Sequence, residues 1–146
     1  MKKQRGKKSK YLIRSKSGLL ENCIWQLSLQ DYNTSLISLI RNELLNRIPG
    51  ITESFNTNSR YFGYWIGEDK DRLYIYVQKK HLRIDLCIDN RHEKEIVKDG
   101  FEVVFANNFQ GRDDWVTGWR VPHNTKNIEA VLKWLCYAFE KSKTNN

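Results

Sequence analysis

Between residues 72 and 88 the chain alternates apolar and polar side chains through two successive runs. Leu73, Ile75 and Val77 alternate with Arg72, Tyr74 and Tyr76, and then Leu82, Ile84, Leu86 and Ile88 alternate with His81, Arg83, Asp85 and Cys87. A period of two is typical of a β-strand that buries one of its faces. Only Gln78-Lys79-Lys80 separates the runs, so the sequence predicts an antiparallel hairpin with these residues in its turn.

Two other segments have the period of a helix. In residues 32–50 the stripe consists of Ile37, Ile40, Leu44 and Ile48, and Pro49-Gly50 predicts its end. In residues 123–143 it consists of Ile128, Val131, Leu132, Leu135 and Phe139. Each stripe must be covered, and the apolar side of the hairpin is the expected partner of both helices.

Shorter patterns predict further strands at residues 60–66, 101–106 and 115–121, and a short helix at residues 91–99. The expected fold class is α+β, with a mostly antiparallel sheet of about five strands and two long amphipathic helices packed on one face. The opposite face would carry Tyr74, Tyr76 and Arg83. Aromatic residues of the run YFGYW, residues 61–65, are further candidates for it.

The excess of positive charge lies at the amino-terminal end. Eight of the 25 Lys and Arg residues precede the first acid, Glu21, which leaves seventeen cations against seventeen acids in residues 17–146. Residues 2–10 contain no apolar side chain and cannot bury enough surface to offset the loss of chain entropy. We therefore predict a basic flexible tail over residues 1–16 and a single α+β domain over residues 17–146.

Cysteine usage and hydropathy bear on the compartment. Cys23, Cys87 and Cys136 stand far apart with no Cys-x-x-Cys pair, which favours a reducing environment. No run approaches the roughly 20 apolar residues of a membrane span. The expectation is a cytoplasmic protein without a membrane partner and without a cofactor.

A series of features over residues 32–141 is similar to a known family. They are a leading amphipathic helix (LISLIRNELLNRIPGI), an aromatic strand (SRYFGYW), the hairpin residues Gln78-Lys79-Lys80-His81-Leu82, the segment DDWVTGW and a closing helix. In this order the chain resembles the bacterial domain-of-unknown-function family 5655, the carboxy-terminal domain of so-called predicted transport proteins, which also accompanies nuclease-like modules. The loop of residues 111–115 departs from that family's Gly-His-Trp-like element. The resemblance implies a fold and a bacterial or phage defence or DNA-processing context, and no established activity.

An enzymatic hypothesis uses the acids that precede the hairpin. Glu68, Asp69 or Asp71, followed by Gln78 and Lys80, resembles the Asp…Gln-x-Lys arrangement of restriction endonucleases, in which acids hold Mg²⁺ and a lysine lies beside the attacking water. The short separation of Asp71 and Gln78 would tie both to one strand, whereas such a site takes its first acid from another strand. His81, His92 and His123 lack the spacings of a local metal site, and no nucleophile elbow or phosphate loop is present. No catalytic or metal-binding residue is assigned.

The leading hypothesis is a non-catalytic nucleic-acid-binding module. Aromatic side chains among cations suit single strands, because bases stack on rings and phosphates meet Lys or Arg. The predicted binding residues are Lys2, Lys3, Arg5, Lys7, Lys8 and Lys10 of the tail, and Tyr74, Tyr76, Lys79, Lys80, His81 and Arg83 of the hairpin. The alternative is a protein-interaction module whose partner covers the tyrosines or Trp115 and Trp134, which are the predicted surface tryptophans.

Overall fold

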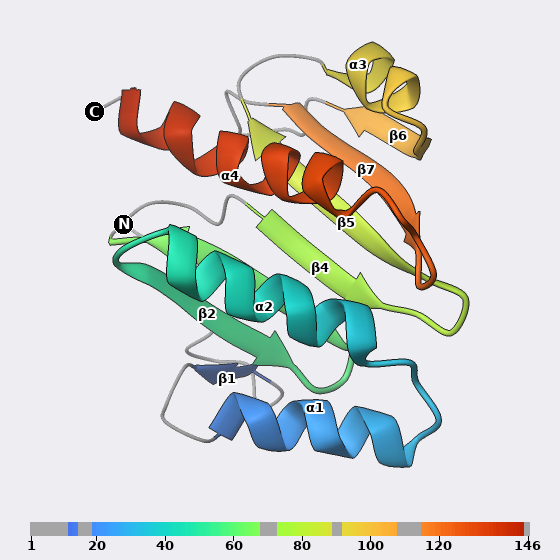
Figure 1. Ribbon diagram of the computed structural model, residues 1–146. Coiled ribbons are helices and arrows are strands. Elements are labelled where there is room, and N and C mark those ends of the chain that lie inside the picture. Colours follow the sequence, from blue (N-terminus) through green and yellow to red (C-terminus); the bar gives the residue numbers. More distant parts are fainter. Residues whose placement is uncertain (1–11, 15–18, 68–72, 89–91, 108–114, 145–146) are drawn as a thin grey trace.

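The sheet of the computed structural model is antiparallel throughout and has the strand order β1-β2-β3-β4-β5-β7-β6 (Figure 1). The structure describes residues 12–14, 19–67, 73–88, 92–107 and 115–144. Its strands are β1 (Leu12–Arg14), β2 (Ile51–Asn56), β3 (Tyr61–Ile66), β4 (Leu73–Val77), β5 (His81–Ile88), β6 (Glu102–Asn107) and β7 (Trp115–Pro122). Strands β1 to β5 are neighbours in chain order, whereas β7 lies between β5 and β6.

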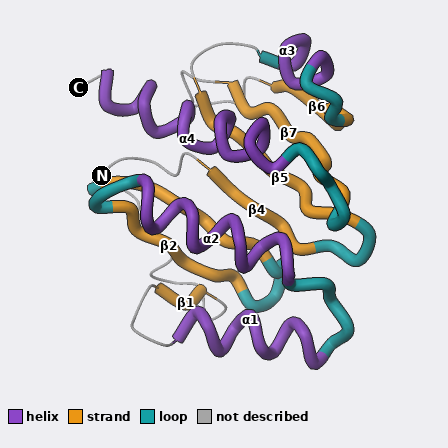
Figure 2. The backbone as a smooth tube through the Cα atoms, in the orientation of Figure 1, coloured by secondary structure: helices purple, strands orange, loops and turns teal. Residues whose placement is uncertain are grey.

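The helices gather on one side of this sheet. They are α1 (Leu19–Leu29), α2 (Ser35–Arg47), α3 (Glu93–Lys98) and α4 (Ile128–Thr144). Figure 2 shows α2 and α4 lying across the same face, with α1 beyond α2 near the β1 edge. Leu27, Leu44, Ile96 and Leu135, one from each helix, belong to a single buried cluster with the apolar side chains of the strands.

The periodic segments form as their sequences predict. Leu73, Ile75, Val77, Leu82, Ile84 and Leu86 are all at most 2% exposed, and Gln78 N donates to His81 O at 3.1 Å across the hairpin turn. The helical stripes of α2 and α4 are buried against them; for example, Ile40 and Leu135 are both 0% exposed. The α+β class, the antiparallel sheet and the hairpin are therefore confirmed.

The predicted count of about five strands and two long helices is too low. In the described ranges there are six strands of five to eight residues, the three-residue edge strand β1, and four helices. The sequence did not reveal β2 or α1. Strand β1 falls inside the range predicted as a tail and pairs with β2, with Leu12 opposite Asn56.

The prediction that Trp134 lies at the surface is wrong. Its side chain is 7% exposed because α3 and its flanks cover that side of α4. The indole ring lies 5.6 Å from the His92 ring and 5.8 Å from the Tyr137 ring, and its Nε1 donates to Asp99 Oδ2 at 2.8 Å. Trp115 is not among the side chains that the structure describes, so the prediction that it lies at the surface stays a prediction. In the described ranges, no helix combines the length and apolar character needed to cross a bilayer.

Replacing Asp99 by asparagine is expected to lower the free energy of unfolding by about 1 kcal/mol at pH 7. The hydrogen bond from Lys133 Nζ, at 2.7 Å, and then that from Trp134 hold the pKa of Asp99 below its ordinary value. This contribution is present above the unfolded-state pKa, about 3.9, and is lost as the pH falls through the lower folded-state pKa. Urea unfolding of the original protein and of Asp99→Asn should be measured from pH 7 to acid. The free energies of unfolding of the two proteins should converge at low pH. A difference that persists unchanged in acid would contradict the ionic origin.

Candidate nucleic-acid interface

The sheet face turned away from the helices carries a group of aromatic side chains. Tyr74 and Tyr76 alternate with the buried residues of β4, and the register places Tyr61 of β3 and Arg83 of β5 on either side of Tyr76. We call this side the tyrosine face and define it by Tyr61, Tyr74, Tyr76 and Arg83. All four are partly exposed, so the face is not sealed beneath another layer of the protein. The predicted placement of Tyr74, Tyr76 and Arg83 is confirmed.

Cross-strand pairing aligns these residues in a row. Tyr61 pairs with Tyr76, Tyr76 with Arg83, and Arg83 with Arg120 of β7. Arg120 in turn pairs with Glu102 of β6, to which its Nη1 donates at 3.0 Å. The row thus passes from an aromatic half to a charged half.

A glycine in the next row brings the tyrosines together. Gly63 lies between Ser54 and Tyr74, and with no side chain there the rings of Tyr61 and Tyr74 meet diagonally, 5.5 Å apart and edge to face. The rings of Tyr61 and Tyr76 are 5.0 Å apart. Three tyrosine rings therefore form one continuous surface.

A β-bulge adds a fourth aromatic ring beside the tyrosine face. Val103 pairs with Trp119 on the core side, and the register then shifts so that Phe105 pairs with Gly118. A bulge inserts one residue and so reverses which face the following side chain takes. Phe105 consequently lies over Gly118, where an added Cβ would collide with the ring.

Arg83 is held tightly in this surface. Its guanidinium carbon lies 4.1 Å from the centroid of the Tyr76 ring and 5.8 Å from that of Phe105. Its Nε and Nη2 donate to the two carboxylate oxygens of Asp85, each at 3.1 Å. Burial raises the pKa of Asp85, and Arg83 opposes that shift. Because a guanidinium has five N–H donors, Arg83 retains donors beyond the two that Asp85 accepts.

The predicted cations of the hairpin turn do not all join the tyrosine face. Lys79 turns towards the helices, where its Nζ donates to the Gln30 carbonyl at 2.6 Å and lies 4.0 Å from the centroid of the Tyr32 ring. Lys80 is exposed, and His81 is half-buried opposite Pro122. Burial and the nearby Arg120 lower the pKa of His81, so its imidazole is largely neutral at pH 7. Lys79 therefore lies beside Gln30 and Tyr32 and not, as predicted, beside Tyr74 and Tyr76.

Other predicted residues lie outside the described ranges. These are the tail residues Lys2, Lys3, Arg5, Lys7, Lys8 and Lys10, and the acids Glu68, Asp69 and Asp71 of the nuclease hypothesis. Gln78 lies in the turn and not on the strand, and its carbonyl accepts from His123 Nε2 at 2.8 Å. Among the described residues, no three His, Cys, Asp or Glu side chains are grouped to hold a metal ion.

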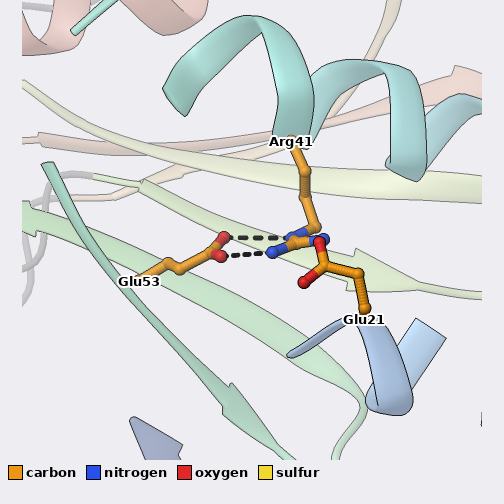
Figure 3. A network of polar contacts seen from close by, with 3 residues as sticks. All are labelled: Glu21, Arg41 and Glu53. Atoms are coloured by element: carbon orange, nitrogen blue, oxygen red, sulfur yellow. Dashed lines mark hydrogen bonds and ion pairs between the residues drawn. The ribbon is translucent and has the colours of Figure 1, made fainter. Parts of the chain in front are cut away.

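A buried ion pair lies on the other side of the sheet, between α2 and β2 (Figure 3). Arg41 is 4% exposed and Glu53 2% exposed; Arg41 donates through Nη2 to Glu53 Oε1 and through Nε to Glu53 Oε2. Arg41 Nη1 also donates to Glu21 Oε2 of α1 at 3.1 Å. Burial disfavours the charged guanidinium, but the hydrogen bond and charge of Glu53 outweigh it and raise the pKa of Arg41 above its ordinary value. This closed network joins α1 and α2 to the sheet.

Sequence reasoning missed Phe105 and Arg120, and it included Tyr61 only among the aromatic candidates of the run YFGYW. Alternation along the run YFGYW could have placed Tyr61 once its phase was known, since Phe62 and Tyr64 belong to the core cluster. No local signal marks the bulge that reorients Phe105. The position of Arg120 follows from the β5–β7 pairing, which sets it opposite Arg83, 37 residues earlier in the chain.

Comparison with known proteins gives no relative: no family model, no curated protein and no solved structure matches the chain. The resemblance to family 5655 therefore stays a prediction.

Proposed function

We propose that the protein is a non-catalytic module that binds single-stranded nucleic acid on the tyrosine face. The observation that carries the proposal is the continuous surface of Tyr61, Tyr74 and Tyr76, with the Arg83 guanidinium stacked on Tyr76 at 4.1 Å. Every nucleobase has a π-face, so rings presented on a partly exposed sheet face can accept bases with little regard to sequence. Duplexes keep their bases stacked inside and suit such a surface poorly.

The net positive charge available for phosphates lies in the tail and not on the tyrosine face. Asp85 and Glu102 accept from Arg83 and Arg120, so the face itself is close to neutral. Phosphate attraction would then come mainly from the tail, whose Lys2, Lys3, Arg5, Lys7, Lys8 and Lys10 have no acid among them.

Alanine at Tyr76 is expected to weaken binding of a short single-stranded oligonucleotide by about 1–3 kcal/mol, which is roughly 5- to 150-fold in Kd. The replaced ring touches both Tyr61 and Arg83. Fluorescence anisotropy titrations with single-stranded DNA, single-stranded RNA and duplex would measure the change. Tyr76→Phe keeps the ring and should keep most of the affinity.

The control is Trp25→Ala, which removes an aromatic side chain that is 56% exposed on α1, away from the tyrosine face. Its affinity should match that of the original protein. Equal weakening by Trp25→Ala and Tyr76→Ala, or no binding of any oligonucleotide at low salt, would overturn the proposal.

A tail deletion separates the contribution of the tail cations to binding from that of the tyrosine face. Removing residues 2–10 leaves β1 in place and takes away six cations. If all six meet phosphates, the slope of log K against log salt should become shallower by about 4. The Tyr76→Ala effect should persist in the shortened chain.

A second candidate is a protein-binding surface on α1. Trp25 and Leu29 are four residues apart on one side of the helix and are 56% and 60% exposed. Such a partner would be lost with Trp25→Asp and retained at high salt, whereas oligonucleotide binding through the tail would not survive high salt.

A further inference from the structure

A pocket of about 280 Å³ lies between α1 and the turn that joins β2 to β3. Asn22 and Gln26 of α1 are four residues apart, and Gln30 continues the same column just beyond the helix end. Phe55 and Arg60 line the opposite wall. The pocket is on the helical side of the sheet, because Phe55 belongs to the buried core cluster, and so it is distinct from the tyrosine face.

One cation, Arg60, lines this pocket, and a second, Lys79, lies beside it and donates to the carbonyl of the lining residue Gln30. The Arg60 guanidinium carbon lies 5.3 Å from the centroid of the Tyr32 ring, and Lys79 Nζ lies 4.0 Å from the same centroid. Among the described residues, neither cation pairs with a carboxylate, and no acidic side chain lines the pocket. Arg60 Nε is buried and has no hydrogen-bond partner within the described part of the chain. Arg60 Nη1 donates to the Asn58 carbonyl at 3.4 Å, and the guanidinium has further N–H groups from which an anionic group can accept.

The carboxamides on the α1 side of the pocket suit an uncharged part of a ligand that carries hydrogen-bond donors and acceptors side by side. Each carboxamide of Asn22, Gln26 and Gln30 presents one acceptor oxygen and an NH₂ group with two donors. Asn and Gln pair with nucleobase edges in this way, with two hydrogen bonds at once. Leu27 and Phe55 give the pocket an apolar floor on which a flat ring can lie.

Cys23 also lines the pocket but does not make it a thiol active site. Burial raises the pKa of the Cys23 thiol, and the nearby Arg41 only partly opposes that shift. The sulfur therefore stays protonated at neutral pH and is a poor nucleophile.

We propose that this pocket binds a nucleoside monophosphate, with the phosphate at Arg60 and the base against the carboxamides of Asn22, Gln26 and Gln30. Its volume of about 280 Å³ is at the lower end of the range for small-molecule pockets, which suits a ligand no larger than one nucleotide. The site is independent of the tyrosine face.

Isothermal titration calorimetry of the full chain with AMP, GMP, CMP and UMP tests the proposal, with the matching nucleosides and inorganic phosphate as partial ligands. At least one monophosphate should bind about tenfold more tightly than both its nucleoside and phosphate. Arg60→Met should weaken that binding by about tenfold or more, since it removes a charge-assisted contact. Gln26→Met should weaken monophosphate binding and leave the response to phosphate unchanged.

The matched control is Arg47→Met, which removes an exposed arginine that pairs with Glu43 on α2. It should bind the monophosphate normally, and Tyr76→Ala should as well, so failure here is distinguishable from failure of the tyrosine face. Circular dichroism checks that each variant folds. Absence of binding by all four monophosphates, equal affinity for inorganic phosphate, or full affinity in Arg60→Met would overturn the proposal.

Discussion

Replacing Glu53 by glutamine is expected to lower the free energy of unfolding by about 3–5 kcal/mol. The substitution keeps the size of the side chain but leaves the charge of Arg41, which is 4% exposed, without its buried partner. Glu21 cannot take over, because its side chain is 65% exposed and its attraction for Arg41 is screened by water. The loss should therefore approach that of an uncompensated buried cation.

Urea unfolding followed by far-ultraviolet circular dichroism would measure this loss. The decisive comparison is the double variant Arg41→Met/Glu53→Leu, which replaces the ion pair by apolar side chains and should recover most of the stability lost in Glu53→Gln. Glu21→Ala should lose less than about 1 kcal/mol. A double variant as unstable as the single one would show that the pair acts through something other than its charges.

Replacing Trp119 by alanine is expected to lower the free energy of unfolding by about 3–5 kcal/mol as well. Trp119 is 0% exposed at the centre of β7, opposite Ile84 on one side and Val103 on the other. Its ring lies 4.8 Å from that of Phe101, which joins the segment before β6 to the core. Alanine would leave a cavity where several elements meet.

The Trp119→Phe variant separates volume from polarity. Trp119 Nε1 is buried and has no hydrogen-bond partner within the described residues, so phenylalanine removes an unsatisfied donor while keeping an aromatic ring. Its destabilisation in urea should be less than half that of Trp119→Ala. Trp25→Ala, at an exposed site, should stay within about 0.5 kcal/mol. Equal effects at positions 25 and 119 would contradict the assigned burial.

The parts of the fold that could be predicted are those whose burial shows in a local period. Helices α2 and α4 and the β4–β5 hairpin each repeat their apolar residues on one side, and each was found. Strand β2 was not, because its central core-facing position holds Glu53 and the apolar alternation stops there. What makes that charge tolerable is Arg41, on a different element. Helix α1 was hidden because apolar side chains lie on its exposed side too, at Trp25 and Leu29.

In the candidate site, too, only the residues placed by a local period were predictable. Alternation alone placed Tyr74, Tyr76 and Arg83 on one face. The partners of these residues depend on strand register, a bulge and the direction of a turn, which are properties of distant contacts. Trp134 shows the same limit: its helix position suggested exposure, but the hydrogen bond from its indole to Asp99 depends on the docking of α3.

The two outer strands have a consequence for how other molecules can approach. Strand β1 has only three residues, and the ladder of β6 is interrupted by its bulge. Within the described residues, neither border strand offers a long, straight series of backbone donors and acceptors, which is what a peptide or a second sheet needs to add a strand. A short border strand and a bulged one both disfavour edge-to-edge aggregation.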